Sequence, residues 1–194
     1  MEEQIDIIFL LDRSGSMHGS EEDTIGGFNS FIENQIKQEA NAKVTTVLFD
    51  HQYEILYKRK NIQDVEKLTR EEYYVRGTTA LLDAIGKTII SMEREIQNKV
   101  LFVITTDGLE NSSIEFSKNQ IKNMIKNHNW EFIFLGADID AYSEASSIGI
   151  ERNHTALYNK SSKGIGDMFK SVEKARFNLV RHNKIDKSWK EDLE

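Results

Sequence analysis

The sequence predicts a doubly wound α/β fold, with a mostly parallel central sheet, one antiparallel edge strand and helices on both faces. Strand-like and helix-like segments alternate along the chain, which is typical of proteins built on parallel sheets. Several strand-like segments are apolar at nearly every position, as expected of strands buried on both faces. Another two strand-like segments are separated by three residues only, which indicates a hairpin that ends at a sheet edge.

Near-continuous apolar runs mark the strands that we expect at the centre of the sheet. They are residues 5–11, 100–106 and 132–135. Residues 44–49 form a further predicted strand. The turn Asp50-His51-Gln52 then leads into residues 53–58, which we predict to be the antiparallel edge strand.

Apolar residues at helical spacing predict the helices between these strands. The predicted helices cover residues 21–39, 80–96, 117–127, a short segment capped by Asp140, and 164–182. The segment Ser20-Glu21-Glu22-Asp23 resembles a capping box. We therefore interpret its acidic residues as a helix start rather than as a second metal site.

The length of 194 residues fits one domain of ordinary size, and no internal repeat or linker is visible. We expect a single domain over residues 1–183. Residues 184–194 are rich in charged side chains, and we predict that they form a frayed C-terminal tail.

Composition narrows the classes of function and location. The net charge is −7 and no basic stripe is visible, which argues against a nucleic acid or an anionic membrane as partner. The absence of cysteine excludes disulfides, thiolate metal ligands and a thiol nucleophile. The first residues are acidic, and the apolar run that follows is short and interrupted by Asp6. We therefore expect no export signal and no membrane span, and a cytoplasmic location.

Polar residues follow the predicted strands at the edge where a doubly wound sheet binds ligands. The first strand leads directly into Asp12, with Ser14 and Ser16 at alternate positions beyond it. The run over residues 100–106 leads into Asp107, and Thr79 precedes a predicted helix. Carboxylate and hydroxyl oxygens suit a hard cation such as Mg²⁺, and hydroxyls add ligands without adding negative charge.

These three segments together resemble the von Willebrand factor A (vWA) domain family, which has a Rossmann-like fold. Asp12-Arg-Ser14-Gly-Ser16 is similar to the family's Asp-x-Ser-x-Ser motif. Thr79-Ala-Leu-Leu-Asp-Ala84 is similar to its threonine loop, and Thr-Thr-Asp107-Gly to its strand-end aspartate. The order and spacing of the three segments also agree, and the resemblance spans about residues 4–182.

The resemblance implies a metal-ion-dependent adhesion site (MIDAS). Ser14, Ser16 and Thr79 would supply hydroxyl ligands, while Asp12 and Asp107 would coordinate the ion directly or through water. In this family a Glu or Asp of a partner protein typically completes the coordination. We therefore predict a monomeric protein-binding module without catalytic residues. Mg²⁺ is the expected ion, and Mn²⁺ or Ca²⁺ are alternatives that such ligands also tolerate.

Two other functions fit parts of the pattern. A Mg²⁺-dependent phosphohydrolase would use Asp12 as nucleophile after the first strand, but that chemistry normally needs a second carboxylate where Ser14 stands. A scaffold that keeps the fold without binding metal is the other alternative.

Within the predicted site, Thr78 competes with Thr79 for the ligand role, and the family's spacing to Ala84 favours Thr79. Glu110, Asn111 and Ser112 follow Asp107, and we regard them as candidates for partner contact. His18 is expected in a loop beside the site, where it would modulate the partner's approach.

Overall fold

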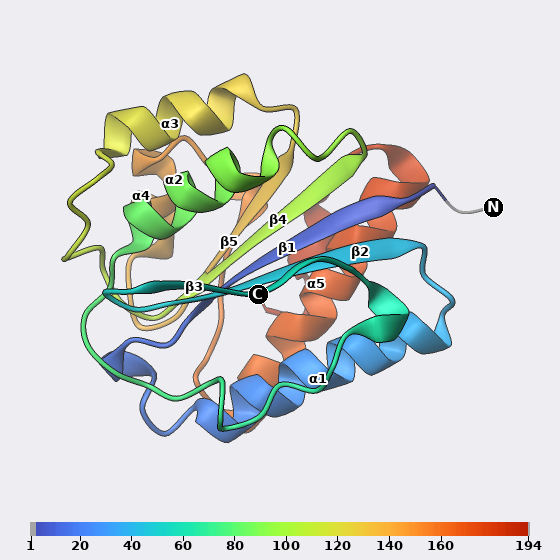
Figure 1. Cartoon of the computed structure of the whole chain (residues 1–194), viewed down its shortest axis with the longest axis horizontal. Helices are drawn as coiled ribbons and strands as arrows, with labels where there is room; N and C mark the ends of the chain where they lie inside the picture. The colour runs from blue at the N-terminus through green and yellow to red at the C-terminus, as the bar shows by residue number, and fades with distance from the viewer. Residues whose placement is uncertain (1–2, 194) are drawn as a thin grey trace.

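The computed structural model describes residues 3–193, in which six strands form one sheet in the order β3-β2-β1-β4-β5-β6. The strands are β1 (Ile5–Asp12), β2 (Ala42–Phe49), β3 (Tyr53–Asn61), β4 (Lys99–Thr106), β5 (Glu131–Gly136) and β6 (Thr155–Leu157). Every neighbouring pair is parallel except β2 and β3, which pair in antiparallel fashion. The predicted fold class is therefore confirmed (Figure 1).

The sheet order places a switch point between β1 and β4. β1 pairs with β2 on one side and with β4 on the other, so the chain moves outward in opposite directions from these two strands. Crevices beyond the carboxyl ends of such strands are the usual ligand sites of open α/β sheets. Asp12 ends β1 and Asp107 directly follows β4, so both carboxylates lie at this switch point.

The helices cover both faces of the sheet. They are α1 (Glu21–Lys37), α2 (Leu81–Met92), α3 (Lys118–Asn127), α4 (Ala141–Ser147) and α5 (Ser162–His182). In Figure 1, α1 and α5 lie on one face, and α2, α3 and α4 lie on the other. Among the described residues, no helix is both long enough and apolar enough to cross a membrane.

Of the two helix caps predicted from the sequence, one is absent from the structure and one is present. α1 begins at Glu21 as predicted, but the Ser20 side chain forms no cap hydrogen bond, so the predicted capping box is wrong. The Glu21 carboxylate instead accepts a hydrogen bond from the Gly19 N–H at 2.6 Å. Asp140 does cap α4, because its Oδ1 accepts a hydrogen bond from the Ser143 N–H at 3.0 Å.

One strand was missed, since three residues at a sheet edge are too few to show a periodic pattern. β6 pairs in parallel with β5, with Thr155 beside Phe134 and Leu157 beside Gly136. Its position directs the following loop, residues 158–161, toward the carboxyl edge of the sheet, because β6 runs parallel to its neighbours.

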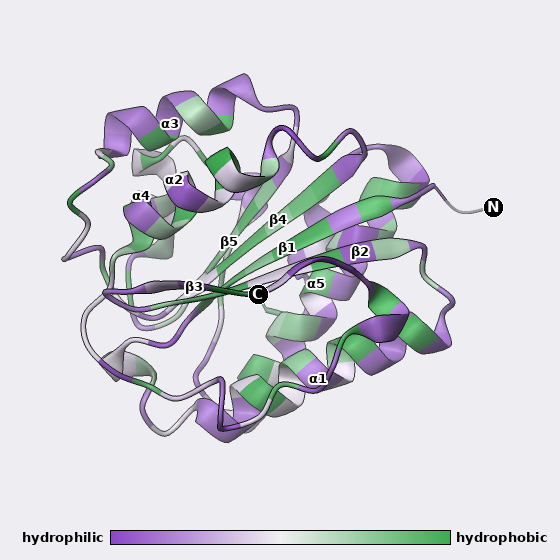
Figure 2. Ribbon diagram, in the orientation of Figure 1, coloured by the Kyte–Doolittle hydropathy of each residue, from purple (hydrophilic) through white to green (hydrophobic). Residues whose placement is uncertain are grey.

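The apolar core has two layers, one on each face of the sheet (Figure 2). On the α1/α5 face, the ring of Phe9 in β1 lies 5.4 Å from Phe28 and 5.1 Å from Phe31, both in edge-on geometry. On the other face, Ile8 and Leu10 pack in the cluster that includes the apolar side of α2. β1 is apolar on both sides because it is the strand that both layers cover.

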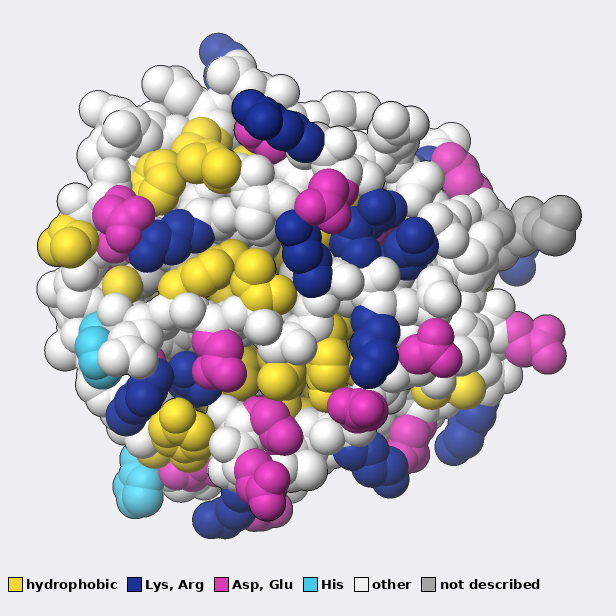
Figure 3. All heavy atoms as spheres, in the orientation of Figure 1, with side chains coloured by type: hydrophobic (Ala, Val, Ile, Leu, Met, Phe, Trp, Pro, Cys, Tyr) yellow, Lys and Arg dark blue, Asp and Glu magenta, His cyan; other side chains and the backbone are white. Residues whose placement is uncertain are grey.

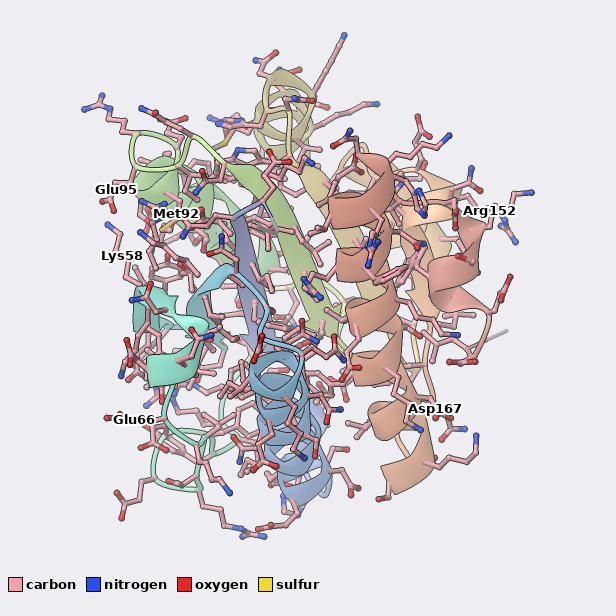
Figure 4. The ribbon with its side chains drawn as sticks, turned by 90° about the vertical axis from the view of Figure 1, so that its right-hand side faces the viewer. Lys58, Glu66, Met92, Glu95, Arg152 and Asp167 are labelled. Atoms are coloured by element: carbon pink, nitrogen blue, oxygen red, sulfur yellow. The ribbon has the colours of Figure 1, made fainter. Side chains whose placement is uncertain are left out.

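Polar contacts attach the antiparallel edge strand to the rest of the sheet. Arg59 of β3 binds the buried carboxylate of Asp6 through Nε at 2.8 Å and Nη2 at 3.2 Å. The adjacent Lys58 pairs with Glu95 at 2.6 Å, and Figure 4 shows these two side chains close together beside Met92. Basic and acidic side chains are interspersed over the described part of the face seen in Figure 3.

Residues 184–193 are folded onto the domain, which differs from the frayed tail predicted for residues 184–194, whose last residue lies outside the described part. Asn183 has a left-handed backbone that ends α5, and a short 3₁₀ helix, Lys187–Lys190, follows. Trp189 is 0% exposed, and its indole N–H donates to the Asn153 carbonyl at 2.8 Å. Ile185 is also buried, in the same core cluster as Trp189. Two isolated apolar residues among charges show no periodicity, although they supply the contacts that hold this segment.

Candidate metal centre

The first part of the site is the turn that follows β1. Asp12 Oδ1 accepts a hydrogen bond from the Ser14 N–H at 2.7 Å, and Oδ2 accepts one from the Thr106 hydroxyl at 2.6 Å. A short 3₁₀ turn, Gly15–Met17, then brings the hydroxyls of Ser14 and Ser16 to 3.1 Å from each other. Asp12 and Ser14 are buried and Ser16 is exposed, so the hydroxyl pair runs from the interior to the surface.

A buried arginine anchors this turn on its far side. Arg13 is 1% exposed, and its Nε lies 3.2 Å from Asp50 Oδ2 while its Nη1 donates to the Glu72 carbonyl at 3.1 Å. Arg76 Nε binds the same Asp50 oxygen at 2.8 Å. Asp50 therefore connects the β1 turn with the β2–β3 turn and with the loop that carries Thr79. No local pattern in the sequence indicates this contact between Arg13 and Asp50, which are 37 residues apart.

The second part of the site is the loop before α2. Gly15 donates its N–H to the Gly77 carbonyl at 3.0 Å, which joins this loop to the β1 turn. Gly77 has a φ of 65°, and a Cβ at this position would lie 2.0 Å from the His51 ring, so any other residue would be strained and would have to displace that ring. Thr79 is 2% exposed whereas its neighbour Thr78 is exposed. The loop thus turns Thr79 toward the interior of the site and Thr78 toward solvent.

The third part of the site is the end of β4. Asp107 Oδ1 accepts a hydrogen bond from the Ser16 hydroxyl at 2.6 Å. A Cβ at Gly108 would lie 2.8 Å from Thr79 Oγ1 and 3.3 Å from Ser16 Oγ. The absence of a side chain at Gly108 therefore lets the three segments approach one another. The five residues singled out by the sequence lie together at one place.

Burial changes the protonation of the deepest carboxylate. Asp12 is 1% exposed, and desolvation raises its pKa from 3.8 to about 6, partly opposed by hydrogen bonds from Ser14 and Thr106. The nearby negative charge of Asp107 adds to this rise. A bound cation would offset both the desolvation of the Asp12 carboxylate and its repulsion by Asp107. The oxygen ligands present therefore fit a divalent ion. Among residues 3–193, no group of three or more His, Asp or Glu side chains could hold a metal by itself.

The comparison with protein families gives a match to the von Willebrand factor type A domain over residues 6–171. The chain belongs to this family. A search of curated proteins finds no match.

Solved structures with the same fold come from several sources, all at identities that show likeness of fold alone. Proximal thread matrix protein 1 of the mussel byssus has a TM-score of 0.70 at 15% identity, covering 88% of this chain and 45% of that chain. The same mussel protein is also known with a zinc-occupied MIDAS motif. The vWF domain of a type V pili tip protein from Porphyromonas gingivalis has a TM-score of 0.67 at 10% identity, over 89% and 96% of the two chains. The pilus adhesin SpaC of Lactobacillus rhamnosus GG has a TM-score of 0.74 at 12% identity, over 93% and 30%.

This vWA domain has a lysine in the site that the sequence analysis missed. Lys160 Nζ lies 2.8 Å from Asp107 Oδ2, 3.0 Å from Asp138 Oδ2 and 3.2 Å from the Ser16 carbonyl oxygen. The hydrogen bond to Asp107 raises the pKa of Lys160, so its ammonium is charged at neutral pH. Lys160 lies 53 residues beyond Asp107, and no local motif indicates this contact.

Two side chains of the loop after Asp107 form hydrogen bonds within the chain. The Glu110 carboxylate accepts hydrogen bonds from the N–H groups of Leu82, Ser112 and Ser113 at 2.7–3.0 Å. The Asn111 side chain accepts one from the Thr79 N–H at 2.9 Å. These hydrogen bonds fix the start of α2 and the backbone of Thr79, and partner contact by Glu110, Asn111 and Ser112 stays a prediction. His18 is exposed and pairs with Glu21 at 3.2 Å.

Asp83 attaches this loop to α2, and its removal is expected to loosen the vWA site. Its buried carboxylate accepts hydrogen bonds from three successive N–H groups, those of Ile114, Glu115 and Phe116, at 2.9–3.0 Å. We expect Asp83→Ala to lower the free energy of unfolding by about 2–4 kcal/mol, because several charge-assisted hydrogen bonds are lost together. Urea unfolding measures this loss, and hydrogen exchange should rise across residues 108–117.

Glu115→Ala is the matched control for Asp83→Ala. It removes a carboxylate from the same loop, but one that forms only a solvent-exposed pair with Lys87 at 2.7 Å. We expect a change within about 0.5 kcal/mol for this variant. Equal effects of the two substitutions would contradict the anchoring role of Asp83.

Proposed function

We propose that this vWA domain binds a divalent cation, Mg²⁺ in the first place, and uses it to bind an exposed Glu or Asp of a partner protein. Asp12, Ser14, Ser16, Thr79 and Asp107 are the proposed ligands, directly or through water. The observation that carries the proposal is their convergence from three separate loops at the β1/β4 switch point.

The charge balance of the site supports an acidic partner. Two carboxylates formally neutralise a divalent ion, and the three hydroxyls contribute oxygen atoms without further charge. The ion in such a site gains energy when an incoming carboxylate replaces a coordinated water. The gain is larger because Asp12 and Asp107 are both nearly inaccessible to solvent, where screening of charge by water is weak.

The same residues support a non-catalytic role. Phosphoryl transfer through Asp12 would require an acid or base beside it. Ser14 stands at that position, and its hydroxyl, which lies 3.1 Å from the Ser16 hydroxyl, is a poor general acid or base. The zinc-occupied MIDAS motif of the structurally similar mussel protein supports metal binding at such a site, and the adhesin and pilus proteins of similar fold support a binding module.

Two adjacent threonines provide a matched test of metal binding. Thr79→Val removes a buried hydroxyl with little change in shape, whereas Thr78→Val removes an exposed one. We expect Thr79→Val to weaken Mg²⁺ binding by about 10-fold or more, and Thr78→Val to leave it unchanged. Isothermal titration and the Mg²⁺-dependent rise in melting temperature measure both variants. Equal behaviour of the two variants would refute the assignment of Thr79 as a ligand.

Peptide display on the immobilised chain tests whether the partner residue is acidic. Selection in Mg²⁺ followed by elution with EDTA is expected to enrich peptides that contain Asp or Glu. Replacing that residue with Asn or Gln in a selected peptide should abolish binding. Peptides retained equally in EDTA, or by the Thr79→Val variant, would argue against a metal-bridged contact.

A further inference from the structure

Lys160 places a positive charge at one of the proposed metal ligands. It lies in the loop between β6 and α5, and its Nζ is 2.8 Å from Asp107 Oδ2. The other oxygen of the same carboxylate, Oδ1, accepts a hydrogen bond from the Ser16 hydroxyl. Both Asp107 oxygens therefore already have a partner within the chain, and the Asp107 side chain is 0% exposed.

We propose that Lys160 is an internal cation that competes with the divalent ion for Asp107 and thereby lowers the metal affinity of the site. This inference rests on the proposed function, because it concerns the same cation. An ammonium and a divalent ion at the same carboxylate repel each other at close range, where little water lies between them. Metal binding must therefore displace Lys160 or bear the cost of this repulsion.

Asp138 is a second carboxylate with which Lys160 can pair when a metal ion binds Asp107. Its carboxylate lies 3.0 Å from Lys160 Nζ, and its side chain is 66% exposed, at the outer rim of the site. A lysine has a long flexible stem and a compact ammonium, so a small rotation is enough for Lys160 to give up Asp107 while keeping Asp138. Binding of the ion would then move the ammonium from Asp107 toward Asp138. There it would add positive charge at the surface that an acidic partner approaches.

The test compares Lys160→Gln with Lys163→Gln in the full chain. Lys163 is the matched control, because it is an exposed lysine nearby in sequence that pairs with Asp167 at 2.6 Å, outside the site. We expect Lys160→Gln to bind Mg²⁺ about tenfold more tightly than the wild type, and Lys163→Gln to bind it equally, in isothermal titration. A merely structural role of Lys160 would give the opposite sign, since loosening the site weakens metal binding.

A double-mutant cycle with Asp138→Asn tests the exchange itself. In the wild-type background, loss of Asp138 removes the second anchor of Lys160 and should weaken Mg²⁺ binding. In the Lys160→Gln background, the same substitution should have a clearly smaller effect. Additive effects would contradict the exchange between the two carboxylates.

The outcomes separate this inference from the function on which it rests. If the wild type binds Mg²⁺ and Lys160→Gln binds it equally or more weakly, the competition is refuted and the proposed function stands. If neither the wild type nor Lys160→Gln binds Mg²⁺ or Mn²⁺, both are refuted. If Lys160→Gln binds Mg²⁺ more tightly than the wild type and Lys163→Gln does not, the result supports both the competition and the proposed function.

Discussion

Asp12→Asn is expected to abolish stabilisation by Mg²⁺ while leaving the metal-free domain at least as stable as the wild type. Asparagine preserves the local hydrogen bonds, because its oxygen can accept from the Ser14 N–H and its amide can donate to the Thr106 hydroxyl. It removes the deepest charge of the proposed ligand set. We expect Mg²⁺ affinity to fall at least about 100-fold, the upper end of what loss of a supporting residue costs at metal sites.

Without metal, the free energies of unfolding of the wild type and of Asp12→Asn should diverge as the pH rises. Burial raises the Asp12 pKa from 3.8 to about 6, so the folded state holds its proton more tightly than the unfolded state does. The contribution of protonated Asp12 to the free energy of unfolding is therefore fully present below pH 4, and it is lost as the pH rises through about 6. The advantage of Asp12→Asn should grow across this window, to at most about 3 kcal/mol at neutral pH.

Urea unfolding at pH 4.5 and pH 7, with EDTA and with Mg²⁺, measures both effects. Asp140→Asn is the control: it makes the same change at an aspartate that caps α4 outside the proposed ligand set, and asparagine also caps helices well. An Asp12→Asn protein that Mg²⁺ stabilises as much as the wild type would contradict the proposed site. If metal-free Asp12→Asn is much less stable than the metal-free wild type, the negative charge of Asp12 itself supports the fold.

Trp189→Ala is expected to be the most destabilising single change in the C-terminal segment. The indole is completely buried among apolar residues, and its N–H donates to the Asn153 carbonyl at 2.8 Å. Removing it creates a large cavity and takes away the hydrogen-bond partner of the Asn153 carbonyl, for which we expect a loss of about 3–5 kcal/mol. Thermal and urea unfolding measure this change.

Trp189→Phe separates the two contributions to this loss. The phenyl ring fills much of the same space but has no N–H, so we expect a smaller loss, about 1–2 kcal/mol. Lys187→Ala changes a residue of the same 3₁₀ helix that is exposed, and should be nearly neutral. A neutral Trp189→Ala would mean that residues 184–193 do not contribute to the stability of the domain.

The strands and the three strand-end loops were predictable because their signals are local. A strand covered on both faces must be apolar at nearly every position, as β1 is. A loop that offers oxygen ligands needs carboxylates and hydroxyls in a fixed spacing, as from Asp12 to Ser16. Where a signal was short or irregular the prediction failed: three residues of β6 show no period, and Trp189 stands alone among charges.

The sequence by itself determined the fold class, the family resemblance and the location of the candidate site. Only the tertiary structure decided that Glu110 and Asn111 hold α2 and Thr79, and that Lys160 reaches Asp107. The physical reason is sequence distance. Backbone preference and hydrophobic period are properties of neighbouring residues, whereas these contacts join side chains many positions apart and depend on how strand order and loop course bring them together.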